Sequence, residues 1–369
     1  MYQIKKASVI GAGTMGLGIA GQLANAGIDV LLLDLPSNEG NRNAICERAI
    51  ERLLDEQQPG LLHKDILNRI SIGNIEDDIE KISESDWIAE AVVERLDIKK
   101  DLYRTIDRIR KKGSMVSSNT STIPISLLVE GMTESFKEEF AITHYFNPVR
   151  YMQLLEIVKG ESTKPEVIEC LSKFNEKEMG KGIVLCNDTP GFLGNRVGVF
   201  AIQTALHKAF EMNLEPEEAD AIFGRPMGIP KTGGFGLYDL IGIDLMSDVA
   251  KSLINILPKN DVFHEVSDEI PSMRKMMDVG LLGNKSTKAD SIDLKIQRTA
   301  QQEKLLIFVN SNIVNTIIQN LKLLFKLKWK MILHFCLRVT INMVVMHGKF
   351  CRIHFAMPLI WFQRLMSHW

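Results

Sequence analysis

The sequence predicts an α/β protein in which a doubly wound parallel sheet is followed by an all-α helical domain. Three observations support this fold class. Short apolar runs of strand length alternate with helical patterns up to residue 188, a glycine turn joins the first strand to the first helix, and long helical patterns dominate from Thr189 to about residue 280. We therefore expect a first domain at 1–188 and a helical domain at 189–287. Residues 288–369 are expected to form an irregular or disordered tail.

The predicted elements follow in chain order. A strand at 7–10, a helix at 14–26 and a strand at 29–35 form a βαβ unit within about 30 residues. The polar stretch 36–69 predicts a helical hairpin outside the sheet, and 97–110 has the pattern of an amphipathic helix. Further buried strands are expected at 87–93, 114–118, 141–144, 154–158 and 182–185.

The composition excludes several classes of protein. The 369 residues carry a net charge of −2 and are 45% hydrophobic and 24% charged, as in an ordinary globular protein, so no basic field for nucleic acid is predicted. The five cysteines include no CxxC pair, so neither a disulfide framework nor a metal site is predicted, and a reducing, cytoplasmic location is expected. No run reaches about 18 uninterrupted apolar residues, so no membrane span is predicted.

The glycine turn points to a dinucleotide. Residues 11–16 read GAGTMG, a GxGxxG pattern that follows a predicted strand and opens a predicted helix. The first glycine makes the turn, the second lets the backbone approach a pyrophosphate, and the third lets helix and strand pack closely. A carboxylate at the end of the second strand can bind both ribose hydroxyls and repel a 2′-phosphate, which favours NAD over NADP. An FAD-binding or cofactor-free Rossmann-type domain is the alternative. The predicted cofactor residues are Gly11, Gly13, Thr14, Met15, Gly16 and Asp34.

A histidine and a glutamate in neighbouring predicted strands could form an acid–base pair. His144 ends one strand and Glu156 lies in the next. A carboxylate bonded to one imidazole nitrogen fixes the tautomer and leaves the other nitrogen to take a proton from a substrate hydroxyl. Taken alone, such a pair is more often structural than catalytic.

Six motifs in a fixed order identify a resemblance. Besides the glycine turn, the chain contains AVVERLDIK at 91–99, SNTS at 118–121, HYFNP at 144–148, LEIV at 155–158 and DTPGFLGNR at 188–196. In these motifs, residues 4 to about 287 resemble the 3-hydroxyacyl-CoA dehydrogenase family of fatty-acid β-oxidation. They look most like the dehydrogenase unit of the bacterial multifunctional enzymes.

The resemblance implies NAD-dependent oxidation of (S)-3-hydroxyacyl-CoA to 3-oxoacyl-CoA. It implies that His144 is the base, that Glu156 orients it, and that Ser121 and Asn195 bind the substrate's 3-oxygen. The implied cofactor contacts near the nicotinamide ribose are Glu94, Lys99 and Asn147, and Lys64, with Arg69, lies where the acyl-CoA phosphates need cations.

Several alternatives stay open at this point. Ser121 could cap a helix beginning near Pro124, Asn195 could cap or bridge loops, and Glu94 could be a surface acid. The nearest enzymatic alternative is a hydroxy-acid dehydrogenase, which would rely on a catalytic lysine. A non-catalytic NAD-binding fragment of a truncated multifunctional enzyme would share every cofactor residue. The family's helical domain buries an apolar face against a partner, so a homodimer through this domain is one expected assembly.

The last part of the chain departs from the family. Residues 224–230 read GRPMGIP where the family often has a GHPMGP-like segment, and after 288 the resemblance stops. Residues 289–369 carry 11 Lys and Arg against 3 Asp and Glu, and one glycine. We interpret 288–369 as a frameshifted reading, which would be refuted if neither other frame of the coding DNA restored a family-like segment. A genuine cationic tail with a membrane-surface stretch at 313–330 is the alternative.

Overall fold

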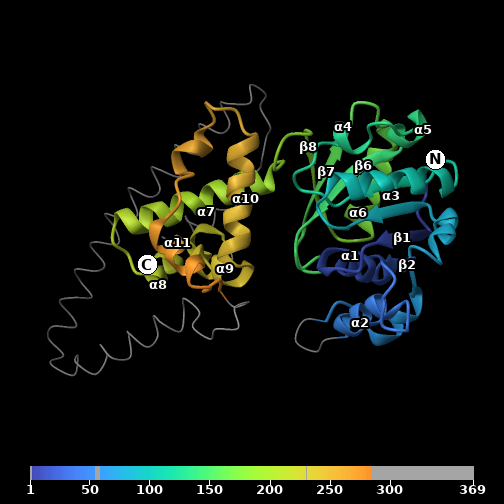
Figure 1. The fold of residues 1–369 in the computed structure, drawn as a ribbon, viewed down its shortest axis with the longest axis horizontal. Helices are drawn as coiled ribbons and strands as arrows, with labels where there is room; N and C mark the ends of the chain where they lie inside the picture. Colours follow the sequence, from blue (N-terminus) through green and yellow to red (C-terminus); the bar gives the residue numbers. More distant parts are fainter. Residues whose placement is uncertain (1, 55–58, 230, 284–369) are drawn as a thin grey trace, which may run out of the picture. The chain divides into compact units, whose positions relative to one another are not determined.

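The computed structural model describes residues 2–54, 59–229 and 231–283 (Figure 1). The chain divides into two compact units. Of the described residues, the first unit contains those from 2 to 203 and from 249 to 267, and the second contains those from 204 to 248 and from 268 to 283. The predicted tail, 288–369, and its frameshift interpretation lie outside the described residues. The domain boundaries expected from the sequence stay a prediction.

The described part of the first unit is built around one eight-stranded sheet with strand order β3-β2-β1-β4-β5-β6-β7-β8. Every neighbouring pair is parallel except β6 and β7, which are antiparallel. The order runs outward in both directions from β1 and β4, which is the arrangement of a doubly wound sheet. The strands are β1 Lys6–Ile10, β2 Asp29–Asp34, β3 Ile70–Asn74, β4 Trp87–Glu90, β5 Met115–Ser118, β6 Phe140–Tyr145, β7 Leu154–Lys159 and β8 Gly182–Cys186.

Helices cover both faces of the sheet and bury two separate cores. Because side chains alternate along a strand, Leu32 of β2 enters one core and Leu33 the other. The first core packs against α1 Thr14–Asn25, α2 Ala44–Leu53 and α6 Pro165–Lys177. The second packs against α3 Leu96–Ile109, α4 Ile125–Leu128 and α5 Glu134–Glu138. Two short 3₁₀ helices, η1 Lys64–Arg69 and η2 Ile79–Glu84, complete the connections.

Helices dominate the described residues from 194 to 283. Helix α7, Gly194–Glu211, begins in the first unit, and α10, Ile243–Ile256, ends in it. In the second unit the Asp220 carboxylate accepts hydrogen bonds from the backbone N–H groups of Gly234, Phe235 and Gly236 at 2.7–2.8 Å, which fixes the start of α9. The other helices of the described residues are α8 Pro216–Ile222, η3 Arg225–Met227, α9 Phe235–Ile241 and α11 Pro271–Asp278 in the second unit, and η4 Val262–Val266 in the first.

The predicted fold class is confirmed, with three corrections. The hairpin expected over 36–69 is wrong in its second arm, because after α2 the described chain forms only the short 3₁₀ helix η1 and then strand β3. Strand β3 and helix α6 were not expected from the sequence. The sheet is not wholly parallel, since the connection of residues 146–153 between β6 and β7 is shorter than the dozen or so residues that a parallel crossover needs.

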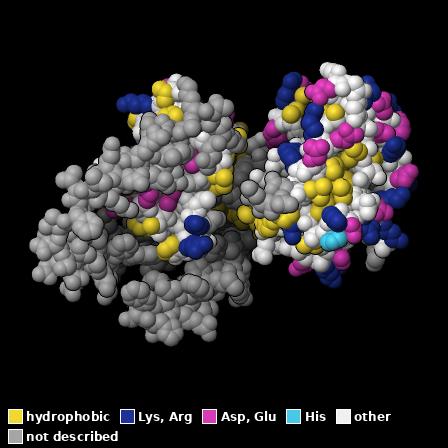
Figure 2. All heavy atoms as spheres, turned by 90° about the horizontal axis from the view of Figure 1, so that it is seen from below, with side chains coloured by type: hydrophobic (Ala, Val, Ile, Leu, Met, Phe, Trp, Pro, Cys, Tyr) yellow, Lys and Arg dark blue, Asp and Glu magenta, His cyan; other side chains and the backbone are white. Residues whose placement is uncertain are grey.

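The surface of the first unit mixes charges of both signs. On the side shown in Figure 2, Lys and Arg side chains lie among Asp and Glu side chains, with a hydrophobic stretch between them. Among the described residues, none of the helices has the length and apolar character that a membrane crossing requires.

Candidate active site

The glycine turn is shaped by backbone packing at its first and third glycines. Gly11 has φ +105°, and a Cβ there would lie 2.5 Å from the carbonyl oxygen of Ala91. A Cβ on Gly16 would lie 1.8 Å from the carbonyl oxygen of Gly11. At Gly13, by contrast, an added Cβ meets nothing within 4 Å, so the middle glycine faces open space. An approaching ligand could use that space to reach the backbone.

The start of α1 suits an anion. Gly13 is the residue before the helix, and the first turn, which includes Thr14 and Met15, contains no acidic residue. The first backbone N–H groups of a helix have no partner within it, and the helix dipole favours negative charge at this end. The turn therefore fits the pyrophosphate of a dinucleotide.

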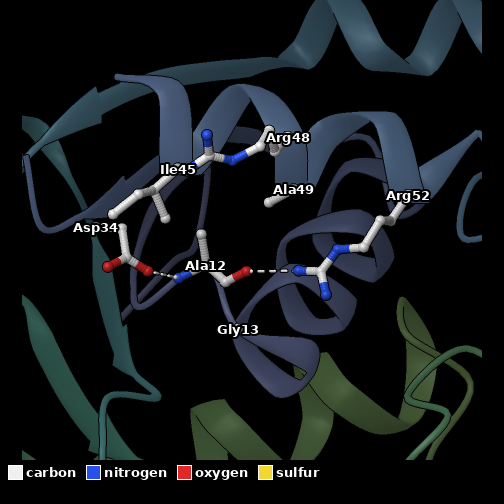
Figure 3. A pocket seen from close by; sticks show the side chains of 7 residues that line it. All are labelled: Ala12, Gly13, Asp34, Ile45, Arg48, Ala49 and Arg52. Carbon is white, nitrogen blue, oxygen red and sulfur yellow. Dashed lines mark hydrogen bonds between the residues drawn. The ribbon is translucent and has the colours of Figure 1, made fainter. Parts of the chain in front are cut away.

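A pocket of about 420 Å³ lies beside the turn (Figure 3). The Asp34 carboxylate at the end of β2 accepts hydrogen bonds from the N–H groups of Ala12 and Leu35. The Arg52 guanidinium on α2 donates to the carbonyl oxygen of Ala12 at 3.0 Å, so both charged side chains hold the turn from opposite sides. A carboxylate next to a hollow here fits a ribose diol. The lining residues are Ala12, Gly13, Asp34, Ile45, Arg48, Ala49 and Arg52.

The histidine and glutamate predicted to act together are cross-strand partners. His144 of β6 lies directly opposite Glu156 of β7 in the antiparallel register. The Nδ1 atom of His144 is 2.7 Å from Oε2 of Glu156, and both side chains are buried. The other carboxylate oxygen, Oε1, accepts from the N–H groups of Leu193 at 2.9 Å and Gly194 at 2.6 Å, at the start of α7.

The surroundings keep the Glu156 carboxylate ionised. Burial raises its pKa, but the hydrogen bonds from His144 and from the Gly194 and Leu193 N–H groups outweigh burial, and the net direction is downward. An ionised carboxylate accepts the proton on Nδ1, which leaves the Nε2 lone pair available. The rings of Phe146 and Phe192 lie 4.6 and 5.7 Å from the imidazole, centroid to centroid, and limit where it can turn.

A second buried carboxylate lies at the end of β4. Glu90 is fully buried and accepts hydrogen bonds at both oxygens. Its Oε1 accepts from Val92 N and Lys99 Nζ, each at 2.7 Å, and its Oε2 accepts from the hydroxyls of Ser118, at 2.7 Å, and Tyr103. Burial, followed by the Glu90 charge, raises the pKa of Tyr103, so this phenol stays a neutral donor.

The buried ion pair of Glu90 and Lys99 is connected to the loop that carries Glu94. The Lys99 ammonium lies 3.4 Å from a Glu94 oxygen, and the Glu94 carboxylate also accepts from the hydroxyls of Thr120 and, at 3.0 Å, Thr122. Burial raises the pKa of Glu94, but Lys99 and these hydroxyls outweigh burial and lower it. Glu94 therefore belongs to a hydrogen-bonded network at the surface, where its side chain is 40% exposed, and its role as a cofactor contact stays a prediction. Lys99, at 1% exposure, faces the two carboxylates, and its role as a cofactor contact stays a prediction.

The remaining residues that were predicted to bind substrate or cofactor lie in four separate segments of the first unit. Ser121 lies in the turn between β5 and α4, and since Pro124 is the N-cap residue of α4, Ser121 is not its cap. Asn195 is the second residue of α7 and follows the two N–H groups that bind Glu156. Asn147 is exposed in the connection that follows His144, and Lys64 is exposed at the start of η1. Their roles stay predictions.

Sequence reasoning missed three charged residues around these positions: Glu90, Arg52 and Lys181. An available signal was the position of Glu90, because an acid inside the apolar run WIAEAVV requires a buried partner. Arg52 gave no such signal, since a basic residue on a polar helix is ordinarily solvated. Among the described residues, no group of three or more His, Cys, Asp or Glu side chains is placed to bind a metal.

Comparisons with known proteins match one family over most of the described residues. A family model described as 3-hydroxyacyl-CoA dehydrogenase, NAD binding domain, matches residues 6–189, and the C-terminal domain of the same family matches 191–289. A Deinococcus radiodurans protein named as a 3-hydroxyacyl-CoA dehydrogenase is 40% identical over 285 residues, which are 77% of this chain and 81% of that protein. The crystal structure of 3-hydroxybutyryl-CoA dehydrogenase from Escherichia coli is 31% identical with a TM-score of 0.65, over 77% of this chain and 58% of that one.

A longer relative has a similar sequence identity to this chain. A Rickettsia prowazekii protein named as a fatty acid oxidation complex trifunctional enzyme is 43% identical over 284 residues, which are 77% of this chain. The chain spans 39% of the length of this relative and of its Rickettsia felis counterpart.

Proposed function

Because the chain belongs to the 3-hydroxyacyl-CoA dehydrogenase family, we propose that it oxidises (S)-3-hydroxyacyl-CoA to 3-oxoacyl-CoA in fatty-acid β-oxidation. The family is one of NAD-dependent oxidoreductases, so the family, the enzyme class and the cofactor predicted from the motifs are confirmed. The observation that carries the proposed reaction is the buried His144–Glu156 pair, whose 2.7 Å contact leaves one imidazole nitrogen as a base, while the acyl-CoA substrate is proposed from the family.

His144 is proposed to take the proton of the substrate's 3-hydroxyl group. As the C3–H bond breaks, the carbonyl forms and the hydroxyl proton passes to Nε2 of His144. The imidazolium then carries a positive charge next to the ionised Glu156, which stabilises the charge and holds the ring in place. Bound NAD supplies the hydride acceptor for this reaction.

The remaining polar residues are proposed to bind and orient. Ser121 and Asn195 would donate hydrogen bonds to the 3-oxygen, where negative charge develops in the reverse reduction. Glu94 and Asn147, with Lys99, would contact the cofactor near the nicotinamide ribose, and Lys64 would contact a phosphate of the acyl-CoA. Lys99 could act directly or through Glu94, whose carboxylate it approaches to 3.4 Å.

NADH-linked turnover of 3-oxoacyl-CoA, followed at 340 nm, tests the proposal. We expect turnover by the full chain, and a loss of about 10²- to 10⁴-fold in His144→Gln. His264→Gln, at a histidine of η4 that is assigned no role in binding or catalysis, is the matched control and should retain activity. Equal activity in His144→Gln and the parent chain would exclude the assigned base.

A non-catalytic NAD-binding protein is the alternative, and it would share every predicted cofactor residue. It predicts NADH binding without turnover by folded protein. The homodimer expected through the helical domain also stays a proposal. Sedimentation equilibrium of the full chain would measure its mass against the 41.6 kDa of one copy.

A further inference from the structure

The connection between β6 and β7 joins the two strands that hold His144 and Glu156. It comprises residues 146–153 and includes Asn147, which is proposed to contact the cofactor. What fixes this connection therefore also fixes part of the proposed nicotinamide site.

One buried cation forms hydrogen bonds with the backbone of this connection. The Nζ atom of Lys181, just before β8, donates to the carbonyl oxygens of Val149 and, at 2.9 Å, Met152. Lys181 is 4% exposed, and among the described residues it forms no ion pair. Burial lowers the pKa of its ammonium to about 8. An apolar side chain of similar length would avoid this cost, but it would leave two carbonyls without these donors.

The same connection also packs against α1, the helix that follows the glycine turn. An ideal Cβ added to Gly18 of α1 would lie 2.8 Å from Cγ2 of Val149, so Val149 packs directly over that glycine. Arg150 also donates to the carbonyl oxygens of Pro59 and, at 3.0 Å, Leu61. The connection 146–153 thus contacts both Lys181 and helix α1, which follows the glycine turn.

We infer that Lys181 is a positioning residue for dinucleotide binding. Its ammonium donates hydrogen bonds to the carbonyl oxygens of Val149 and Met152. These bonds keep Val149 packed against α1 and keep Asn147 at its proposed position beside the cofactor. Lys181 does not touch the cofactor or the reacting atoms in this role. The inference rests on the proposed function only for the location of the nicotinamide site.

NADH affinity, measured by fluorescence titration of the full chain, tests this role without any need for turnover. Lys181→Met should raise the Kd for NADH about tenfold, which corresponds to the loss of donors to two buried carbonyls. Lys181→Arg, whose guanidinium can donate to both carbonyls, should restore the Kd to within about threefold. Lys177→Met, at an exposed lysine of α6, is the matched control and should leave the Kd unchanged.

A kinetic split separates positioning from a general loss of structure. In Lys181→Met the KM for NADH should rise while kcat at saturating NADH stays within about threefold, because the His144–Glu156 pair is not altered. A folded Lys181→Met protein with the parent Kd for NADH would overturn the inference. If the parent chain binds NADH but does not reduce 3-oxoacyl-CoA, the proposed function fails, whereas the comparison of Kd values still decides the role of Lys181.

Gly18→Ala provides a second test if Lys181→Met does not fold. Alanine favours the helix over glycine by about 1 kcal/mol, but its Cβ would push Val149 and the connection away from α1. We expect a Kd for NADH raised about threefold or more, with thermal stability close to that of the parent. An unchanged Kd would show that the position of this connection does not control cofactor binding.

Discussion

The two ends of the site are built by different means. At the cofactor end, residues 11–16 are contiguous, and their geometry follows from glycines whose missing Cβ atoms make room for neighbouring backbone. At the reacting end, His144, Glu156 and the start of α7 come from three separate segments and are held by a buried charge. Backbone shape therefore governs the first end, where Asp34 and Arg52 also bind the turn from outside, whereas a charge buried inside the site governs the second. Substitutions should affect them in correspondingly different ways.

The largest expected effect is at the reacting end. In Glu156→Gln the amide oxygen can still accept from the Leu193 and Gly194 N–H groups, but the amide NH₂ now faces Nδ1 of His144. The imidazole must then accept at Nδ1 and carry its proton on Nε2, where the substrate requires a base. We expect kcat to fall about 10³-fold or more while the protein stays folded.

Steady-state turnover at 340 nm beside circular dichroism would measure both properties of this variant. Glu161→Gln, an exposed glutamate two residues beyond β7, is the matched control. Activity within about tenfold of the parent would show that the charge on Glu156 does not set the tautomer, and the contrast between the two ends would be lost.

How far the sequence predicts the molecule follows the same division. The βαβ unit around residues 11–16 was predictable, because its strand, turn and helix signals are local. The pairing of His144 with Glu156 was suggested by their positions in neighbouring predicted strands, whereas its catalytic role was implied only by the resemblance to the family. The short connection 146–153 was an available sign of that pairing. The contacts of Glu90 and Lys181 depend on partners far along the chain, which residue patterns do not reveal.

A second prediction concerns the buried pair at the end of β4. Among the described residues, Lys99 is the only cation that forms an ion pair with Glu90, so Lys99→Met leaves a buried carboxylate with three neutral donors. We expect the free energy of unfolding to fall by about 3 kcal/mol, and NADH binding to weaken as Glu94 loses its neighbouring charge. Adding Glu90→Gln should recover part of that stability.

Urea denaturation of the two variants and of Lys173→Met would measure these differences. Lys173 forms an exposed pair with Glu169 on α6, so its loss should cost less than about 1 kcal/mol. If Lys99→Met and Lys173→Met cost the same, burial would not distinguish the two pairs and the electrostatic account of this region would fail.

A third prediction separates two glycines of the cofactor end. Gly16→Ala places a methyl group against the Gly11 carbonyl and should lower the free energy of unfolding by about 2 kcal/mol. Gly13→Ala meets open space, so it should leave stability unchanged but weaken NADH binding, because its methyl group occupies the space next to the helix N-terminus. Thermal denaturation and NADH titration of both variants would measure this. Loss of stability in Gly13→Ala with unchanged NADH affinity would contradict the assignment of that space to the cofactor.

The smallest expected effect is a pH dependence of stability at the reacting end. The pKa of Glu156 is lowered in the folded protein, so this carboxylate stabilises the fold at pH values above its unfolded pKa, which is about 4.3. That contribution is lost as the pH falls through the lower, folded pKa. Glu156→Gln has no such group, so the parent should be the more stable protein near neutral pH, and the difference should shrink as the solution is acidified below about pH 4. Denaturation of both proteins between pH 3 and pH 7 would measure this difference. A difference that stayed constant across that range would mean that the bonds from His144, Leu193 and Gly194 do not favour the ionised form of Glu156.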